Sequence, residues 1–279
     1  MGDVSFDVAK APLHWRRRFN ELRAIDGRRC EIETELSREL NRLVELRSVG
    51  ARRSYDEVFY AVSGPDRLGV VRVNSPAKPG PSMPAGDSHL VVPLQTVDRL
   101  DREWGSYVAL SPDGLSPKPL WRCEDAIACE WLAWSRMSDL VRDPAAFWAT
   151  AERVVPAVRR MHDAGVTHLD LNPGNVLLES GGDGVAFIDF EFAAADWAYT
   201  PLQQAYDYLR LTSECLRPRR GGRQLTADPT RWTRLLAEAA PAAARSAKLI
   251  LREKRLQRLA ENEAVFAAVQ AVFPKVATL

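Results

Sequence analysis

Two segments in the first half of the chain have the apolar and β-branched pattern of strands, EVFYAV (Glu57–Val62) and LGVVRV (Leu68–Val73). The turn-forming sequence SGPDR joins them, so the pair is predicted to form a hairpin. Before the hairpin, apolar residues recur at helical spacing between about residues 14 and 46, which predicts one helix running into a first strand near Leu43–Val49. These apolar positions are Leu36, Leu40, Leu43 and Val44.

A proline- and glycine-rich stretch follows the hairpin, and residues 75–87 are expected to resist regular structure. The next pattern predicts a helix from about Val97 to Leu110, with Leu100, Trp104 and Tyr107 on one face. One or two strands should then end in AIACEWL (Ala126–Leu132). Residues from about 40 to 132 are therefore predicted to form a small β-rich lobe with one helix.

The second half of the chain is predicted to be mainly helical. Asp143, followed by proline, is a good N-cap for a helix that Gly165 would end, with a kink at Pro156. The apolar stripe of this helix consists of Phe147, Trp148, Ala151, Val155, Val158 and Met161. Two short strands, NVLL and AFIDF, should follow, joined by GGDG (Gly181–Gly184). Helical patterns resume from about residue 201 to the C-terminus.

Composition and net charge narrow the class of protein but do not identify a function. The 279 residues are 46% hydrophobic and 27% charged, as in an ordinary globular protein, and the net charge of +1 gives no general attraction to nucleic acid. The four cysteines form no CxxC pair, so reduced thiols in the cytoplasm are expected instead of a zinc site or disulfides. The N-terminus lacks a signal-peptide pattern, and no apolar run approaches the roughly 18 residues of a membrane span.

The most specific stretch of the chain is HLDLNPGNVLL (His168–Leu178), followed by FIDFEFA (Phe187–Ala193). It places Asn175 five residues after Asp170, and Asp189 fourteen residues further on inside an apolar strand. Phosphoryl transfer requires a carboxylate that orients a hydroxyl group and oxygen ligands that hold Mg²⁺. Asp170 is the candidate for the first role, and Asn175 and Asp189 are candidates for the second. His168 is expected to hold the loop backbone.

Each of these residues also has an ordinary structural interpretation. Asp and Asn are common turn formers, and an Asp at the end of a strand can cap a neighbouring helix. The joint order favours the catalytic interpretation, because a helix, G-x-x-H-x-D-x-x-x-x-N, an apolar strand, a turn and a second strand with I-D-F follow one another.

This order resembles the protein-kinase-like superfamily, in particular its aminoglycoside phosphotransferases, choline-type kinases and lipopolysaccharide-core sugar kinases. The resemblance is strong from Arg159 to Phe192. It implies an α+β, two-lobed protein-kinase-like fold with a small antiparallel β-rich N-lobe and a mainly helical C-lobe. The expected division is an N-terminal helical extension (1–42), an N-lobe (43–132) and a C-lobe with C-terminal helices (133–279). The implied cofactors are ATP and Mg²⁺.

The same resemblance assigns nucleotide-binding roles in the N-lobe. Arg72 occupies the place of the basic residue that grips the phosphates, and Glu103 on the following helix is its expected ion-pair partner; an exposed strand Arg and a solvated Glu are the alternatives. Glu130 and Leu132 flank Trp131 in the expected hinge around the adenine base. No G-x-G-x-x-G is present. The residues left open for phosphate contact are Arg52, Arg53, Ser54 and, as a substitute for Arg72, Lys78.

Three features favour a small or sugar-bearing acceptor over a protein. Leu169 stands where protein kinases have Arg, Asn172 stands where Ser/Thr kinases have Lys, and no A-P-E follows Asp189. Glu191 is typical of the small-molecule branches. Specificity is expected to reside in residues 194–279.

Basic segments at 14–19, 217–223 and 248–259 have two interpretations. The last is read as an amphipathic helix with Leu249, Ile250, Leu256 and Leu259 on its apolar side. Contact with an anionic membrane surface is one interpretation, which would make the protein peripheral to the membrane. A solvated helix face is favoured, and nucleic-acid binding is not expected. The oligomeric state stays open.

The sequence therefore predicts a kinase that transfers the γ-phosphate of ATP to a hydroxyl group of a small molecule or sugar, which could be lipid-linked. A nucleotide-binding pseudokinase scaffold is the first alternative, because the glycine-rich loop is missing and Arg72 replaces Lys. A protein Ser/Thr kinase is the second.

Overall fold

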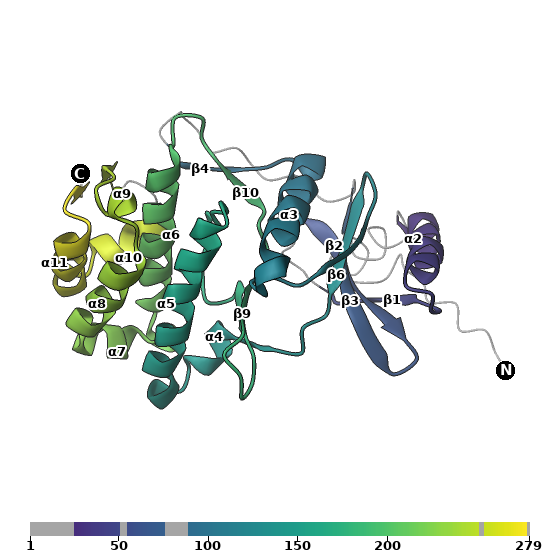
Figure 1. Cartoon of the computed structure of the whole chain (residues 1–279), viewed down its shortest axis with the longest axis horizontal. Helices are drawn as coiled ribbons and strands as arrows, with labels where there is room; N and C mark the ends of the chain where they lie inside the picture. Colours follow the sequence, from purple (N-terminus) through teal and green to yellow (C-terminus); the bar gives the residue numbers. More distant parts are fainter. Residues whose placement is uncertain (1–24, 51–54, 76–88, 251–253, 278–279) are drawn as a thin grey trace, which may run out of the picture. The chain divides into compact units, whose positions relative to one another are not determined.

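The computed structural model describes residues 25–50, 55–75, 89–250 and 254–277 (Figure 1). The chain divides into two compact units, each described by itself below. Met1–Pro81 and Leu120–Trp131 form the first, which we call the sheet unit. Ser82–Pro119 and Leu132–Leu279 form the second, which we call the helical unit.

The sheet unit is built on a five-stranded sheet in the order β1-β2-β3-β6-β5. The β1–β2, β2–β3 and β3–β6 pairs are antiparallel. The expected hairpin is confirmed, since β2 and β3 pair from Asp56↔Asn74 to Ser63↔Asp66. The strands are β1 (Glu45–Ser48), β2 (Asp56–Ser63), β3 (Asp66–Asn74), β5 (Pro119–Arg122) and β6 (Ala126–Glu130).

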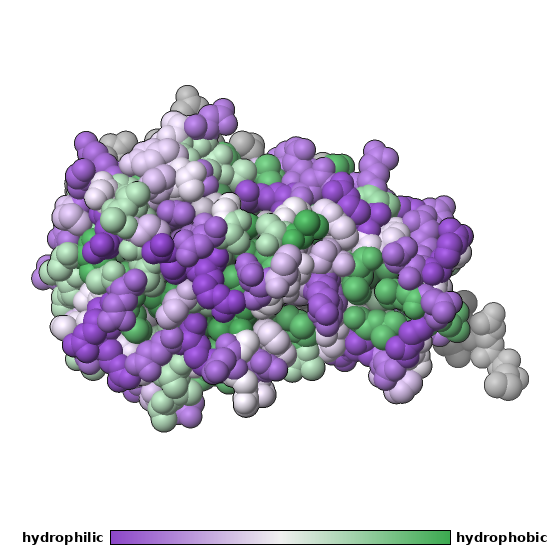
Figure 2. Space-filling view, viewed as in Figure 1, coloured by the Kyte–Doolittle hydropathy of each residue, from purple (hydrophilic) through white to green (hydrophobic). Residues whose placement is uncertain are grey.

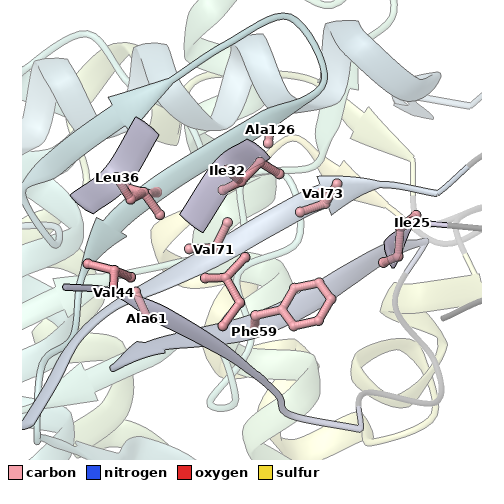
Figure 3. Close-up of a cluster of buried hydrophobic side chains, with 11 residues drawn as sticks. Ile25, Ile32, Leu36, Val44, Phe59, Ala61, Val71, Val73 and Ala126 are labelled. Carbon is pink, nitrogen blue, oxygen red and sulfur yellow. The ribbon is translucent and has the colours of Figure 1, made fainter. Parts of the chain in front are cut away.

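Helix α2 (Asp26–Glu39) supplies part of the core of the sheet unit. Its Ile32 and Leu36 are fully buried and lie over the sheet beside Val71 and Ala61 (Figure 3). The expected helix of residues 14–46 is thus shorter where it can be described, and residues 1–24 lie outside the described ranges. Leu43, expected on the apolar face, is 78% exposed because the helix has ended before it.

The helical unit carries most of the helices, and α5, α6 and α8 stand side by side in it (Figure 1). Its α-helices are α3 (Thr96–Leu110), α4 (Met137–Leu140), α5 (Phe147–Asp163), α6 (Thr200–Cys215), α7 (Gly222–Ala227), α8 (Pro229–Ala239), α9 (Ala242–Arg245), α10 (Gln257–Ala260) and α11 (Glu263–Val272). Short 3₁₀ turns are η2 (Ser111–Asp113), η3 (Pro144–Ala146), η4 (Pro218–Arg220) and η5 (Lys254–Leu256).

Three small sheets complete the helical unit. The order β7-β8-β9 joins strands Ser135–Arg136, Val176–Leu178 and Val185–Phe187, which include the expected NVLL and AFIDF strands. Strand β10 (Phe192–Ala194) pairs antiparallel with β4 (Val91–Pro93). Strand β11 (Leu249–Ile250) pairs parallel with β12 (Val276–Ala277).

Local sequence signals predicted α5, the helix that precedes the HLDLNPGNVLL motif. The Asp143 side chain accepts a hydrogen bond from the N–H of Ala145 at 2.9 Å, so the expected cap closes the 3₁₀ turn η3, which leads into α5. At the other end Gly165 has φ +79°. A left-handed residue is the usual way for a helix to end, and glycine adopts it without a Cβ penalty.

The expected amphipathic helix over residues 248–259 is wrong. The segment contains β11, the 3₁₀ turn η5 and the start of α10, and residues 251–253 lie outside the described ranges. Leu249, Leu256 and Leu259 are all buried within the helical unit. Their pattern reflects packing against other elements of the unit, so these residues do not present an apolar face to a membrane.

The expected α+β class is confirmed, with a small antiparallel sheet in one unit and mainly helices in the other. The proposed boundaries at residues 42 and 132 stay predictions, as does an irregular segment at 75–87, nearly all of which lies outside the described ranges. No helix in the described part of the chain is long and apolar enough to cross a membrane. Polar and apolar residues are interspersed on the face in Figure 2.

Candidate active site

The loop between α5 and β8 carries the sequence motif, and it has an unusual backbone. Leu169 has φ +64°, and Asp189, just after β9, has φ +72°. Residues with a Cβ adopt this region at a cost of roughly 1 kcal/mol or more, and such residues gather at functional sites. The surrounding structure must therefore hold these two positions in place.

Asp207 of α6 holds the first of them. Its side chain is fully buried and accepts hydrogen bonds from the N–H groups of His168 at 2.8 Å and Leu169 at 2.7 Å. The ring Nε2 of His162 lies 3.0 Å from the same carboxylate. A buried carboxylate with three such partners is well satisfied and fixes the direction of the loop.

His168 holds the backbone, as expected from the sequence. Its Nε2 lies 3.0 Å from the carbonyl oxygen of Ile188, and its Nδ1 lies 3.3 Å from the N–H of Asp170. A carbonyl only accepts and an N–H only donates, so the geometry fits a neutral ring with the proton on Nε2. The ring also stacks on Phe190 with centroids 4.6 Å apart. His168 thereby ties the Asp170 loop to the Asp189 segment.

Asp170 itself is part of an ion-pair network. Its Oδ1 lies 3.1 Å from Nη2 and 3.3 Å from Nε of Arg210, and 3.0 Å from Nη1 of Arg255. Its side chain is 18% exposed. The cations gather on Oδ1, and the one hydrogen bond that Oδ2 makes in the described structure comes from Nδ2 of Asn172 at 3.4 Å.

The network continues behind Asp170 through Glu214. This carboxylate lies 2.6 Å from Nη1 of Arg210, 2.8 Å from Arg217, and in contact with Arg220. Burial alone would raise the pKa of Glu214, but Arg210 and Arg217 outweigh it and hold that pKa below its ordinary value. Likewise, burial works to lower the pKa of Arg210, and Asp170 and Glu214 raise it above its ordinary value.

Asn175 is the first of the two expected metal ligands, and its position is fixed by hydrogen bonds. Its Nδ2 donates to the carbonyl oxygen of Asp170 at 3.2 Å, which turns the amide oxygen away from that carbonyl. Its own carbonyl oxygen accepts from the N–H of Ile188 at 3.0 Å, continuing the β8–β9 ladder in which Val176 pairs with Phe187. The ladder thus sets Asn175 opposite the residue that precedes Asp189.

The donor set of these two residues fits Mg²⁺. An amide oxygen and a carboxylate are hard oxygen ligands, and Mg²⁺ commonly takes its remaining ligands from water and phosphate oxygens. The Asp189 backbone is steadied from two sides. Its N–H lies 3.5 Å from the Tyr107 hydroxyl, and the next residue, Phe190, is fully buried against the Tyr107 ring at 6.0 Å.

Two nucleotide-binding candidates already have charged or polar partners. Arg72 on β3 is 9% exposed, and its Nη2 lies 3.0 Å from the fully buried carboxylate of Asp56 on β2. Glu103 on α3 is 1% exposed and accepts a hydrogen bond from the Tyr107 hydroxyl at 2.5 Å. The exposed-Arg and solvated-Glu alternatives are therefore wrong. The Arg72–Glu103 pair itself stays a prediction, because the two residues lie in different units.

The expected hinge residues follow β6. Glu130 ends that strand opposite Gly69, where an added Cβ would lie 2.6 Å from the carbonyl oxygen of Cys129, so the strands need glycine there. Trp131 is half-buried, and its N–H donates to the carbonyl oxygen of Leu68 at 3.0 Å. Leu132 begins the next part of the helical unit and is also half-buried. Adenine binding by Glu130 and Leu132 stays a prediction.

Sequence reasoning missed the residues that hold Asp170. Asp207, Arg210 and Glu214 lie at positions i, i+3 and i+7 of α6, which places them along one face of the helix. The spacing of these three charged residues along one helix was a signal in the sequence. No sequence signal indicated the role of Arg255, because this residue lies 85 positions from Asp170 within a run of basic residues.

A family model matches the part of the chain that carries these residues. Residues 111–202 match the model of a family described as "Phosphotransferase enzyme family", and they include Asp170, Asn175 and Asp189. The expected resemblance to phosphotransferases is confirmed over these residues, and with it the prediction of a phosphotransferase enzyme. Curated proteins gave no match.

Solved kinase structures are also similar to the chain. The Mycobacterium tuberculosis PknI kinase domain is 19% identical, with 83% of this chain and 88% of that chain covered and a TM-score of 0.43. A Plasmodium vivax ethanolamine kinase is 10% identical, with 84% and 75% covered and a TM-score of 0.46.

Proposed function

We propose that this phosphotransferase uses ATP and Mg²⁺ to phosphorylate a hydroxyl group of a small molecule or sugar, with Asp170 as the residue that orients the hydroxyl. The observation that carries the proposal is the way Asp170 is fixed. Asp207 and His168 hold its backbone, two arginines hold Oδ1, and Asn175 is bonded to its carbonyl oxygen. Such preorganisation is the main contribution a protein makes to phosphoryl transfer.

The reaction assigns a role to each of these residues. The acceptor oxygen forms a bond to the γ-phosphorus while the bond to the bridging oxygen breaks, and that electron pair leaves with ADP. The hydroxyl proton passes to Oδ2 of Asp170. Asn175 and Asp189 would hold Mg²⁺, which neutralises phosphate charge when bound. Arg72 and Glu103 are proposed to organise the phosphates, and Glu130 and Leu132 to line the adenine site.

An acceptor screen with matched variants tests the proposal. Aminoglycosides, choline-like alcohols and core sugars are offered with Mg²⁺·ATP, and ADP formation and acceptor phosphorylation are measured. Asp170→Asn should lower kcat by about 10²–10⁴-fold, because an amide cannot take the proton, while ATP binding is retained. Asp163→Asn, an exposed carboxylate paired with Arg159, is the control and should match the wild type. Normal turnover by Asp170→Asn would show that another residue does this work.

A nucleotide-binding scaffold is the second candidate, and the Arg72–Asp56 ion pair favours it. A cation held by a buried carboxylate has less freedom to grip phosphate than one that is unengaged. Thermal shift with ATP, with and without Mg²⁺, separates the candidates when it is combined with the acceptor screen. Nucleotide-dependent stabilisation without phosphorylation of any acceptor would support the scaffold. Phosphate incorporated into generic proteins would instead indicate a protein kinase.

A further inference from the structure

We propose that Arg210 and Arg255 form an anion-binding subsite beside Asp170, so that the acceptor carries a phosphate or carboxylate group near the hydroxyl that is phosphorylated. This inference rests on the proposed function, since it names the chemical class of the acceptor. It depends only on residues of the helical unit.

Two guanidinium groups meet on one oxygen of Asp170. Arg210 approaches Oδ1 through Nη2 and Nε, and Arg255 approaches the same atom through Nη1 at 3.0 Å. One carboxylate is neutralised by one cation. Two cations therefore face the single charge of the residue that orients the acceptor, and one of them, Arg210, is shared with Glu214.

The excess grows when the whole network is considered. Among the residues that the structure describes, the ion pairs connect four arginines, Arg210, Arg217, Arg220 and Arg255, to two carboxylates, Asp170 and Glu214. Within this described set, positive charges outnumber carboxylates by two. A partly buried cluster with net positive charge attracts anions more strongly than exposed arginines do, because solvent screens it less.

The two arginines differ in how firmly they are held. The Arg210 side chain is 9% exposed and is bonded to Glu214 and to the carbonyl oxygen of Arg255. That carbonyl also accepts from the hydroxyl of Ser213 at 3.0 Å, so the backbone of Arg255 is anchored to α6. Arg210 is thus a fixed cation.

Arg255 is the group that an incoming anion can reach. Its side chain is 34% exposed, and its guanidinium carbon lies 4.2 Å from the centroid of the Phe192 ring. Within the described ranges, Asp170 is the only carboxylate within ion-pair distance of Arg255. A guanidinium has five donors, so one bond to Asp170 leaves others for a phosphate or carboxylate.

Matched acceptor pairs test which group the subsite binds. Galacturonate is compared with galactose, and glycerol 3-phosphate with glycerol, so that one arm reports on carboxylates and the other on phosphates. The wild type should prefer the anionic member of at least one pair. Arg255→Gln should raise the ratio of the KM for that anionic member to the KM for its neutral partner about tenfold or more, on top of any change in kcat that both members share because Asp170 has lost a cation. Arg142→Gln, an exposed arginine paired with Asp139, should behave as the wild type.

Kinetics also separate the proposal from a different role of Arg255. If Arg255 acted only through Asp170 or on the transferred phosphoryl group, Arg255→Gln would lower kcat/KM by the same factor for both members of a pair. That result would overturn the proposal, as would a preference of the wild type for the neutral member.

Anion binding provides a readout that does not need turnover. The melting temperatures of the wild type, Arg255→Gln and Arg142→Gln are followed during titration with inorganic sulfate. The sulfate midpoint of Arg255→Gln should be about tenfold higher than the other two. An equal sulfate response in all three proteins would reject the subsite even if the chain is a kinase. A clear difference without phosphorylation of any acceptor would reject only the proposed function.

Discussion

At the scale of single residues, the site depends on carboxylates that carry out no chemistry. Asp207 is fully buried and directs both of its oxygens to the backbone of the Asp170 loop and to His162. The left-handed backbone of Leu169 is sterically unfavourable, and the bond from its N–H to Asp207 at 2.7 Å is what offsets that cost. Asp207 is therefore a positioning residue.

Asp207→Asn should disable the enzyme without removing any catalytic atom. The amide keeps one acceptor but turns an NH₂ group toward a backbone N–H, so one buried donor loses its partner. We expect the free energy of unfolding to fall by about 3 kcal/mol and transfer to fall about 100-fold. Urea unfolding and steady-state kinetics measure both.

Amide hydrogen exchange of His168 and Leu169 adds a readout specific to positioning. Both amides should exchange faster in Asp207→Asn than the rest of the helical unit, while the exposed control Asp163→Asn should change neither. Unaltered protection at these two amides together with normal transfer would mean that Asp207 does not hold the loop.

At the scale of elements, the sequence predicted helices and strands that depend on neighbouring residues, and it did not predict contacts between residues far apart in the chain. The β2–β3 hairpin, α3, and the β8 and β9 strands follow from periodicity and turn residues that lie next to one another in the chain. The prediction of an amphipathic helix over residues 248–259 was wrong, because the leucines of this segment are buried against elements that are distant in the sequence. Arg255 meets Asp170 only through the fold, so no local pattern could have predicted that contact.

The sequence assigned helix α2 to an N-terminal extension, and two leucine substitutions test whether α2 is part of the core of the sheet unit. Leu36 is fully buried against the sheet, whereas Leu43, just after the helix, is 78% exposed (Figure 3). Leu36→Ala should lower the free energy of unfolding by about 3 kcal/mol, and Leu43→Ala should change it by less than about 0.5 kcal/mol. Urea unfolding followed by fluorescence and circular dichroism measures both. Equal, small effects would mean that α2 is a detachable appendage.

At the scale of the whole molecule, one charged network joins the site to several elements of the helical unit. Glu214 of α6 is 3% exposed at its side chain and contacts Arg210, Arg217 and Arg220, which links α6 to η4 and, through Arg210, to Asp170. Stability and the geometry of Asp170 are therefore coupled through a single carboxylate.

That coupling predicts how stability depends on pH. The arginines hold the pKa of Glu214 below its ordinary value in the folded protein, so the unfolded chain binds the proton first as the pH falls. The stabilisation from Glu214 is complete above its ordinary pKa and is lost as the pH falls toward the lowered one. Glu214→Gln should thus lower the free energy of unfolding by about 3 kcal/mol near neutral pH, and by much less in acid.

Urea unfolding of the wild type and Glu214→Gln at a series of pH values between about 7 and 2 tests this dependence. The difference between the two proteins should shrink as the pH falls. Glu152→Gln is the matched control, because Glu152 pairs with Arg231 at the surface with both side chains at least 40% exposed. Exposed ion pairs contribute little to stability, so the free energy of unfolding of Glu152→Gln should stay within about 1 kcal/mol of the wild-type value at each pH. A constant difference between wild type and Glu214→Gln across the range would show that Glu214 stabilises the fold by packing and not by its charge.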